Sequence, residues 1–68
     1  MSKKWWGYLH INGSIQVKPL LSESDVYDAY ESPFVERVFH PFEIPEGTGE
    51  TRNYSINHCK QILENSNV

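Results

Sequence analysis

Three histidines and one cysteine are the side chains in this sequence best suited to metal binding or nucleophilic catalysis. His58 and Cys59 are neighbours, and adjacent side chains on a helix point about 100° apart, so they do not converge on one ion. His10 and His40 can approach each other if their strands pair, but no Cys-x₂-Cys or His-x₃-His spacing supplies further ligands. We therefore expect no metal site.

Cys59 is also the single thiol that could act as a nucleophile. A catalytic thiol usually lies at a helix N-terminus or beside a cation, where its pKa is lowered. Cys59 instead falls in the middle of a helical pattern with Ile56 and Ile62, which predicts a small buried side chain. The stretch 47–49, Gly-Thr-Gly, lacks the lysine of a phosphate-binding loop. We expect no catalytic residue, no cofactor and no enzymatic activity.

Carboxylates gather along one expected helix. Asp25, Asp28 and Glu31 recur at i, i+3 and i+6, with Glu23 nearby, which places them on one exposed face. Such a row is usually a solvated face, and it can also imitate the phosphates of a nucleic acid or steer a basic partner. Mimicry normally takes more carboxylates than this. We interpret Asp25, Asp28 and Glu31 as residues that steer a partner protein.

Nine aromatic side chains are more than 68 residues can bury. Trp5 and Trp6 are adjacent on an expected strand, so they point to opposite faces of the sheet. At least one should lie on the face away from the helices, beside Tyr8 or Leu9. Because Trp and Tyr are enriched at interface centres, we predict that Trp5, Trp6 and Tyr8 anchor a bound partner. Homodimerisation through the sheet, and a plain structural role in wrapping the core, stay open.

Three lysines, Lys3, Lys4 and Lys18, flank these aromatic residues. A basic rim with stacking aromatic side chains is how single-stranded nucleic acid is often held. Six Lys and Arg against nine Asp and Glu give a net charge of −3, which opposes sequence-independent nucleic-acid binding. Nucleic-acid binding through Lys3, Lys4 and Lys18 is therefore the alternative interpretation.

Two β-prone runs separated by an Asn-Gly pair predict a β-hairpin over residues 5–18. A two-residue type I′ turn pairs Ile11 with Ser14. A three-residue loop that pairs Ile11 with Ile15 gives a cleaner apolar face. The Asn-Gly chemistry favours the first register, which we adopt, and the apolar pattern favours the second.

The later patterns predict, in order, a helix over 23–31, a strand over 38–44, a loop over 45–50 and a helix over 51–64. Ser22 is a suitable N-cap for the first helix, and Pro33 should end it. Residues 34–37 are expected to add one helical turn. Pro41 cannot donate to a strand ladder, which predicts an edge strand or a bulge.

This order predicts an α+β fold, a single small domain over residues 1–68 with a β-hairpin–α–β–α chain path. We expect a three-stranded antiparallel or mixed sheet with both helices on one face. Residues 1–4 and 65–68 are expected to fray. No apolar run approaches the roughly 20 residues of a membrane span, and a lone cysteine suits a reducing compartment. We therefore expect a cytoplasmic protein with no membrane partner.

Two stretches resemble small uncharacterised proteins encoded by bacteriophages and prophages. They run over residues 6–18 (WGYLHINGSIQVK) and over 31–43, which includes ESPFVERVF and PFE. The resemblance covers about residues 5–44 and transfers no catalytic residue. It implies a genomic context in which short reading frames often encode inhibitors of host or defence proteins. We therefore expect a non-enzymatic accessory protein in a bacterial cytoplasm that binds and inhibits a host or antiviral-defence protein by steric occlusion. A self-associating virion component is a further alternative.

Overall fold

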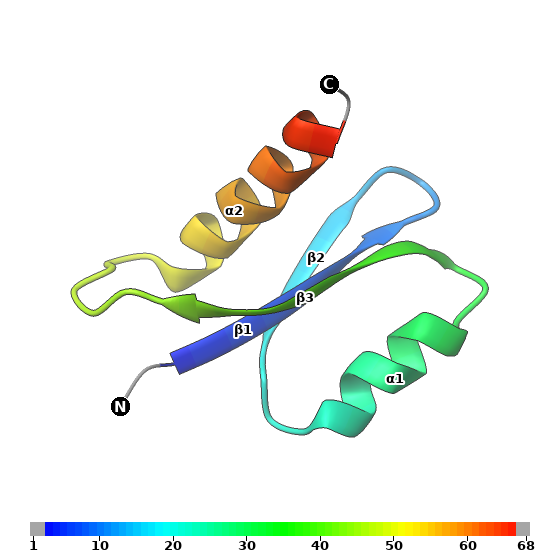
Figure 1. The fold of residues 1–68 in the computed structure, drawn as a ribbon, viewed down its shortest axis with the longest axis horizontal. Helices are drawn as coiled ribbons and strands as arrows, with labels where there is room; N and C mark the ends of the chain where they lie inside the picture. The colour runs from blue at the N-terminus through cyan, green and yellow to red at the C-terminus, as the bar shows by residue number, and fades with distance from the viewer. Residues whose placement is uncertain (1–2, 67–68) are drawn as a thin grey trace.

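Five elements follow one another in the predicted order. The computed structural model describes residues 3–66, and its elements are β1 (Lys3–His10), β2 (Ile15–Pro19), α1 (Glu23–Glu31), β3 (Val35–Ile44) and α2 (Thr51–Ser66). The strands form one antiparallel sheet in the order β2-β1-β3, which makes β1 the central strand (Figure 1). The predicted α+β fold and chain path are confirmed.

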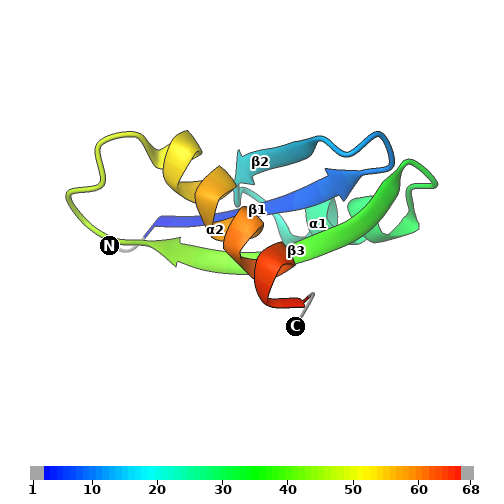
Figure 2. The ribbon, with the colours of Figure 1, turned by 90° about the horizontal axis from the view of Figure 1, so that it is seen from above.

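The two helices lie on opposite faces of the sheet, so the prediction that both cover one face is wrong (Figures 1 and 2). The buried residues of the α1-side core are Trp6, Val26 and Ala29. Those of the α2-side core are Val17, Phe39 and Cys59. The physical reason is that β1 alternates between two apolar faces, and each face needs its own cover.

The hairpin is confirmed, but its predicted register is wrong. Leu9 pairs with Ile15 and Gly7 with Val17, so neither of the pairings expected for Ile11 occurs. In the observed register, both apolar residues of β2 face α2 together with Leu9. This is the grouping of side chains that the apolar pattern favoured, reached through a different alignment of the strands.

The hairpin loop spans three residues, Ile11 to Gly13. The Gly13 N–H donates to the His10 carbonyl at 2.9 Å, and Gly13 has φ of 94°. This is a type I turn followed by a left-handed glycine, a common three-residue hairpin connection. The Asn12 side-chain oxygen also accepts the Ser14 N–H at 2.9 Å. The Asn-Gly pair therefore closes a bulged loop and does not form the centre of a type I′ turn.

The first helix has the predicted limits, and β3 is longer than predicted. Ser22 caps α1 by accepting the Ser24 N–H, and the chain is extended again at Ser32. β3 already begins at Val35, so the helical turn expected over 34–37 is wrong. The register of β3 against β1 shifts across Pro41, which sits in an edge strand beside this bulge, as predicted.

Part of the two ends expected to fray lies within regular elements. Lys3 and Lys4 belong to β1, and Asn65 and Ser66 belong to α2. The Arg37 guanidinium donates to the Ser66 hydroxyl at 3.0 Å, which ties the last turn of α2 to β3. Residues 1–2 and 67–68 lie outside the described residues. Within 3–66, neither helix has the length and apolar character needed to cross a membrane.

Gly7 allows the central strand to pack closely against its neighbours. A Cβ atom added there would lie 2.6 Å from the backbone oxygen of Gln16 and 3.5 Å from the Cys59 Sγ atom. Only a residue without a side chain fits between β2 and α2 at this point. Gly7 therefore helps to set the spacing on the α2 side of the sheet.

Candidate functional site

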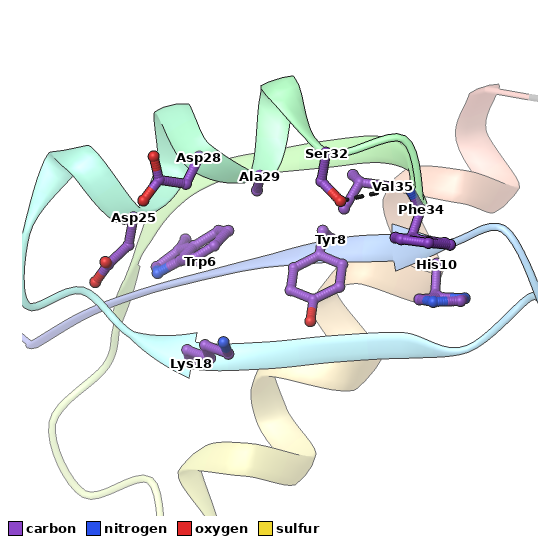
Figure 3. A pocket seen from close by; sticks show the side chains of 10 residues that line it. All are labelled: Trp6, Tyr8, His10, Lys18, Asp25, Asp28, Ala29, Ser32, Phe34 and Val35. Atoms are coloured by element: carbon purple, nitrogen blue, oxygen red, sulfur yellow. Dashed lines mark hydrogen bonds between the residues drawn. The ribbon is translucent and has the colours of Figure 1, made fainter.

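A groove of about 500 Å³ lies on the α1 side of the sheet, between α1 and β2 (Figure 3). We call it the α1–β2 groove. Its floor is β1, whose alternate residues Trp6, Tyr8 and His10 point to this side. The groove exists because α1 packs against β3 and the Trp6 side chain, which leaves β2 uncovered on this face.

One end of the groove is acidic. Asp25 and Asp28 of α1 form the wall, and both side chains are exposed. The side-chain hydrogen bonds found within residues 3–66 involve neither carboxylate. Lys18 of β2 stands on the opposite side, with its Nζ atom 5.8 Å from the centre of the Tyr8 ring. The two carboxylates are therefore available to a cation from outside the chain.

The other end of the groove is apolar and aromatic. Phe34 is 58% exposed, and its ring stacks on His10 with centroids 6.2 Å apart and planes 8° apart. The Ser32 hydroxyl accepts the Phe34 N–H at 3.3 Å (dashed in Figure 3). The Ile11 N–H donates to the Phe34 carbonyl at 3.0 Å, which joins the hairpin loop to this segment. An exposed ring on a hydrogen-bonded turn is suited to contact with an apolar ligand group.

The indole nitrogen of Trp6 is buried without a hydrogen-bond partner. Trp6 is 2% exposed, and its Nε1 atom has no acceptor among the described residues. In Figure 3 this nitrogen points toward the Asp25 end of the groove. Buried polar groups are nearly always paired, and an unpaired one costs about 1–3 kcal/mol. The groove therefore contains one buried hydrogen-bond donor to which the described residues offer no acceptor.

The predicted aromatic anchors have three different locations. Trp6 is enclosed between β1 and α1, so the prediction that it is a surface anchor is wrong. Trp5 is half-buried against the α2-side core. Tyr8 is half-buried and lines the groove. The error follows from the misplaced helices, because each tryptophan faces a different helix: Trp6 packs against α1 and Trp5 lies on the α2 side.

The predicted charged residues are only partly brought together. Asp25, Asp28 and Lys18 line the groove, whereas Glu31 is exposed outside its lining. Strand alternation places Lys3 and Lys4 on opposite faces of β1, so with Lys18 they do not form one basic rim. Trp6 has no free face on which a base could stack. The arrangement expected of a single-strand binding surface is therefore not formed.

Five residues that line the groove were not predicted as site residues: His10, Ala29, Ser32, Phe34 and Val35. His10 follows from the alternation of β1 after Trp6 and Tyr8, once the face of Trp6 is known. Phe34 and Ser32 lie in the turn after α1. An aromatic residue directly after the proline that ends a helix was the available signal, since such a turn is exposed.

Cys59 has the properties of a core residue. It is fully buried, and burial raises the pKa of the Cys59 thiol to about 11, so the thiolate is disfavoured at neutral pH. The neighbouring His58 packs its ring 4.3 Å from that of Phe42. Within residues 3–66, no three His, Cys, Asp or Glu side chains are grouped closely enough to hold a metal ion.

Comparison with known proteins gives no relative for this chain. No protein-family model matches it, and neither a curated protein nor a solved structure is significantly similar. What the protein does must therefore be inferred from the groove and its side chains.

Proposed function

We propose that the chain is a non-enzymatic binding protein that captures part of a partner protein in the α1–β2 groove and acts by steric occlusion of that partner. The observation that carries the proposal is the unpaired, buried N–H of Trp6 at a groove with an acidic end and an apolar end. A donor that lacks an acceptor in the free protein gains one when a ligand supplies it. The resemblance to phage-encoded proteins supports a host or antiviral-defence protein as the partner.

A protein fits the groove better than a nucleic acid does. Asp25 and Asp28 would repel phosphates at the end of the groove where Trp6 can donate, and the chain carries a net charge of −3. The exposed ring of Phe34 instead matches an apolar side chain, of the kind that often dominates binding energy at protein interfaces. We therefore propose a protein partner.

A pull-down with two matched variants tests this proposal. The tagged protein is incubated in parallel with untreated and nuclease-treated lysate of a bacterial host, and the captured proteins are quantified. Phe34→Ser removes an exposed ring of the groove, and Tyr27→Ser removes an equally exposed ring (64%) that does not line it. We expect the tyrosine variant to capture the same protein as the wild type. The phenylalanine variant should capture it at least fivefold less, the effect of losing one interface anchor.

The contrary results are equally specific. Equal capture by both variants would place the binding surface elsewhere and contradict a role for the groove. Capture that is lost on nuclease treatment would mean nucleic-acid binding. Recovery of the protein alone, as a stable oligomer, would favour the virion component.

A further inference from the structure

We infer that the α1–β2 groove selects an extended peptide segment with an arginine or lysine side chain at one position and an apolar side chain four residues away. This inference rests on the proposed function and specifies the chemistry of the partner. The observations behind it are the two unlike ends of the groove, their separation along β1, and the unpaired Trp6 N–H beside the acidic end.

The spacing comes from the floor of the groove. Trp6, Tyr8 and His10 are every second residue of one strand, so the first and last lie ~13 Å apart at 3.3 Å per residue. The acidic end lies beside Trp6 and the apolar end beside His10 (Figure 3). In an extended ligand, side chains four residues apart are on the same face with the same separation. One ligand strand can therefore reach both ends.

The acidic end is suited to a cation. Asp25 and Asp28 lie three residues apart on α1, so their carboxylates face the same side of the helix. A guanidinium group offers several N–H donors to two such carboxylates, and its charge compensates theirs. A carboxylate in the ligand would be repelled here. Asp25 and Asp28 carry two negative charges against the one positive charge of Lys18 on the opposite wall, so the net charge of this end favours a basic side chain.

The Trp6 N–H selects an acceptor close to that cation. An extended peptide presents backbone carbonyl groups along its length, and one carbonyl oxygen would satisfy the indole donor. The nitrogen has no exposed surface in the free protein, so a neighbouring side chain must rotate first. Lys18 and Asp25 are exposed side chains at this end of the groove, and either can move without breaking the core. After such a rotation, one carbonyl oxygen of the ligand would pair with the Trp6 N–H.

The apolar end completes the selection. Phe34 exposes 58% of its surface, and its ring stacks on that of His10. An aliphatic or aromatic side chain of the ligand would bury part of this surface, at roughly 25 cal/mol per Å². Because the two ends differ, the order of side chains in the segment determines its chain direction in the groove. A segment with the opposite order would bind in the opposite direction.

Nuclear magnetic resonance with defined peptides tests the inference directly. The probe is the acetylated, amidated peptide Arg-Thr-Thr-Thr-Leu. The protein has two indole N–H signals, from Trp5 and Trp6, and Trp6→Phe identifies the second by its loss. We expect the Trp6 signal to move downfield as the peptide is added, while that of Trp5 stays unchanged. Two control peptides are Glu-Thr-Thr-Thr-Leu, with the charge reversed, and Arg-Thr-Thr-Leu-Thr, with the apolar residue on the other face. Both should bind at least tenfold more weakly.

Charge variants of the protein provide a second measurement that does not depend on Trp6→Phe being folded. Asp25→Asn together with Asp28→Asn should weaken binding of the arginine peptide about threefold to tenfold, as expected for two exposed ion pairs. Glu43→Gln together with Glu64→Gln changes the net charge equally at exposed sites outside the groove, and should leave the affinity unchanged.

Several outcomes would overturn the inference. These are equal binding of all three peptides, no movement of the Trp6 signal at 5 mM peptide, or a shift of that signal by oligothymidylate. A Trp6 signal that depends on protein concentration without peptide would assign the groove to a second copy of the chain. If the peptides fail while Phe34→Ser still abolishes capture in the pull-down, the proposed function stands and only the chemistry of the segment is wrong.

Discussion

Replacing Gly7 by alanine should destabilise the fold through the backbone of β2. The added Cβ atom would lie 2.6 Å from the Gln16 carbonyl oxygen, and contacts below 3.0 Å are essentially never seen for real Cβ atoms. Relief requires β2 to move away from β1 by about 0.4 Å at their closest point, where Gly7 pairs with Val17. A shift of this size would lengthen the hydrogen bonds of the β1–β2 ladder on either side of this pair.

The magnitude follows from two opposing effects. Overpacking of a well-packed interior lowers the free energy of unfolding by about 1–3 kcal/mol. Alanine at position 7 also lowers the conformational entropy of the unfolded chain, which raises the free energy of unfolding by about 0.4–1 kcal/mol. We expect a net loss of about 1–2 kcal/mol in the free energy of unfolding. Since 1 kcal/mol corresponds to about 4–8 °C for a domain of this size, Tm should fall by roughly 5–15 °C.

Urea unfolding followed by far-ultraviolet circular dichroism measures this loss, with Gly49→Ala as the control. Gly49 has nothing within 4 Å of an added Cβ atom, so its replacement should be neutral or slightly stabilising. Because the closest atom to Gly7 belongs to the backbone, Cys59→Ala should not rescue Gly7→Ala. A Gly7→Ala protein as stable as Gly49→Ala, or a full rescue by Cys59→Ala, would refute the argument from backbone crowding.

Two further predictions concern the cores. Trp6→Ala should lower the free energy of unfolding by about 3–5 kcal/mol and unfold most of the protein, because Trp6 is the largest buried side chain against α1. A folded circular dichroism spectrum with an unchanged Tm would contradict this prediction. The second prediction concerns pH. Burial raises the pKa of the Cys59 thiol from 9.0 to about 11, so between these values the unfolded chain has lost a proton that the folded chain keeps. The free energy of unfolding should therefore fall as pH rises through this window, by up to about 3 kcal/mol more than in Cys59→Ala. Urea titrations of both proteins in reducing buffer at about pH 8 and about pH 11 measure this difference. An equal loss in the free energy of unfolding in both proteins would contradict the prediction.

The elements that depend on local chemistry could be predicted from the sequence. The Ser22 cap and the helix stop before Pro33 are properties of a few neighbouring residues, and α1 has the predicted limits. Pro41 likewise indicated an edge strand beside a bulge.

The faces of the sheet depend on contacts between distant segments, and here the prediction was wrong. Trp5 and Trp6 require apolar cover on both faces of β1, whereas the order of the elements alone favours a single layer of helices. The strand pairing was misjudged for a related reason. An Asn-Gly pair fits two kinds of hairpin loop, and the packing of Leu9 and Ile15 against α2 selects between them.

The candidate site was predicted in part. Tyr8, Lys18, Asp25 and Asp28 were singled out and do line one groove, although they had been assigned to two different functions. Sequence patterns place residues on faces of single elements. They do not give the gap between α1 and β2, which depends on how α1 packs against β3 and Trp6.

The placement of the helices on opposite faces makes the two sides of the molecule different. The groove opens on the α1 face, whereas α2 closes the other face and carries exposed residues such as Lys60 away from it. A fluorophore attached only at Lys60 would leave the groove unobstructed, whereas one attached at Lys18 would stand in its lining. A partner bound in the groove would in turn leave α2 accessible to antibodies or to proteases.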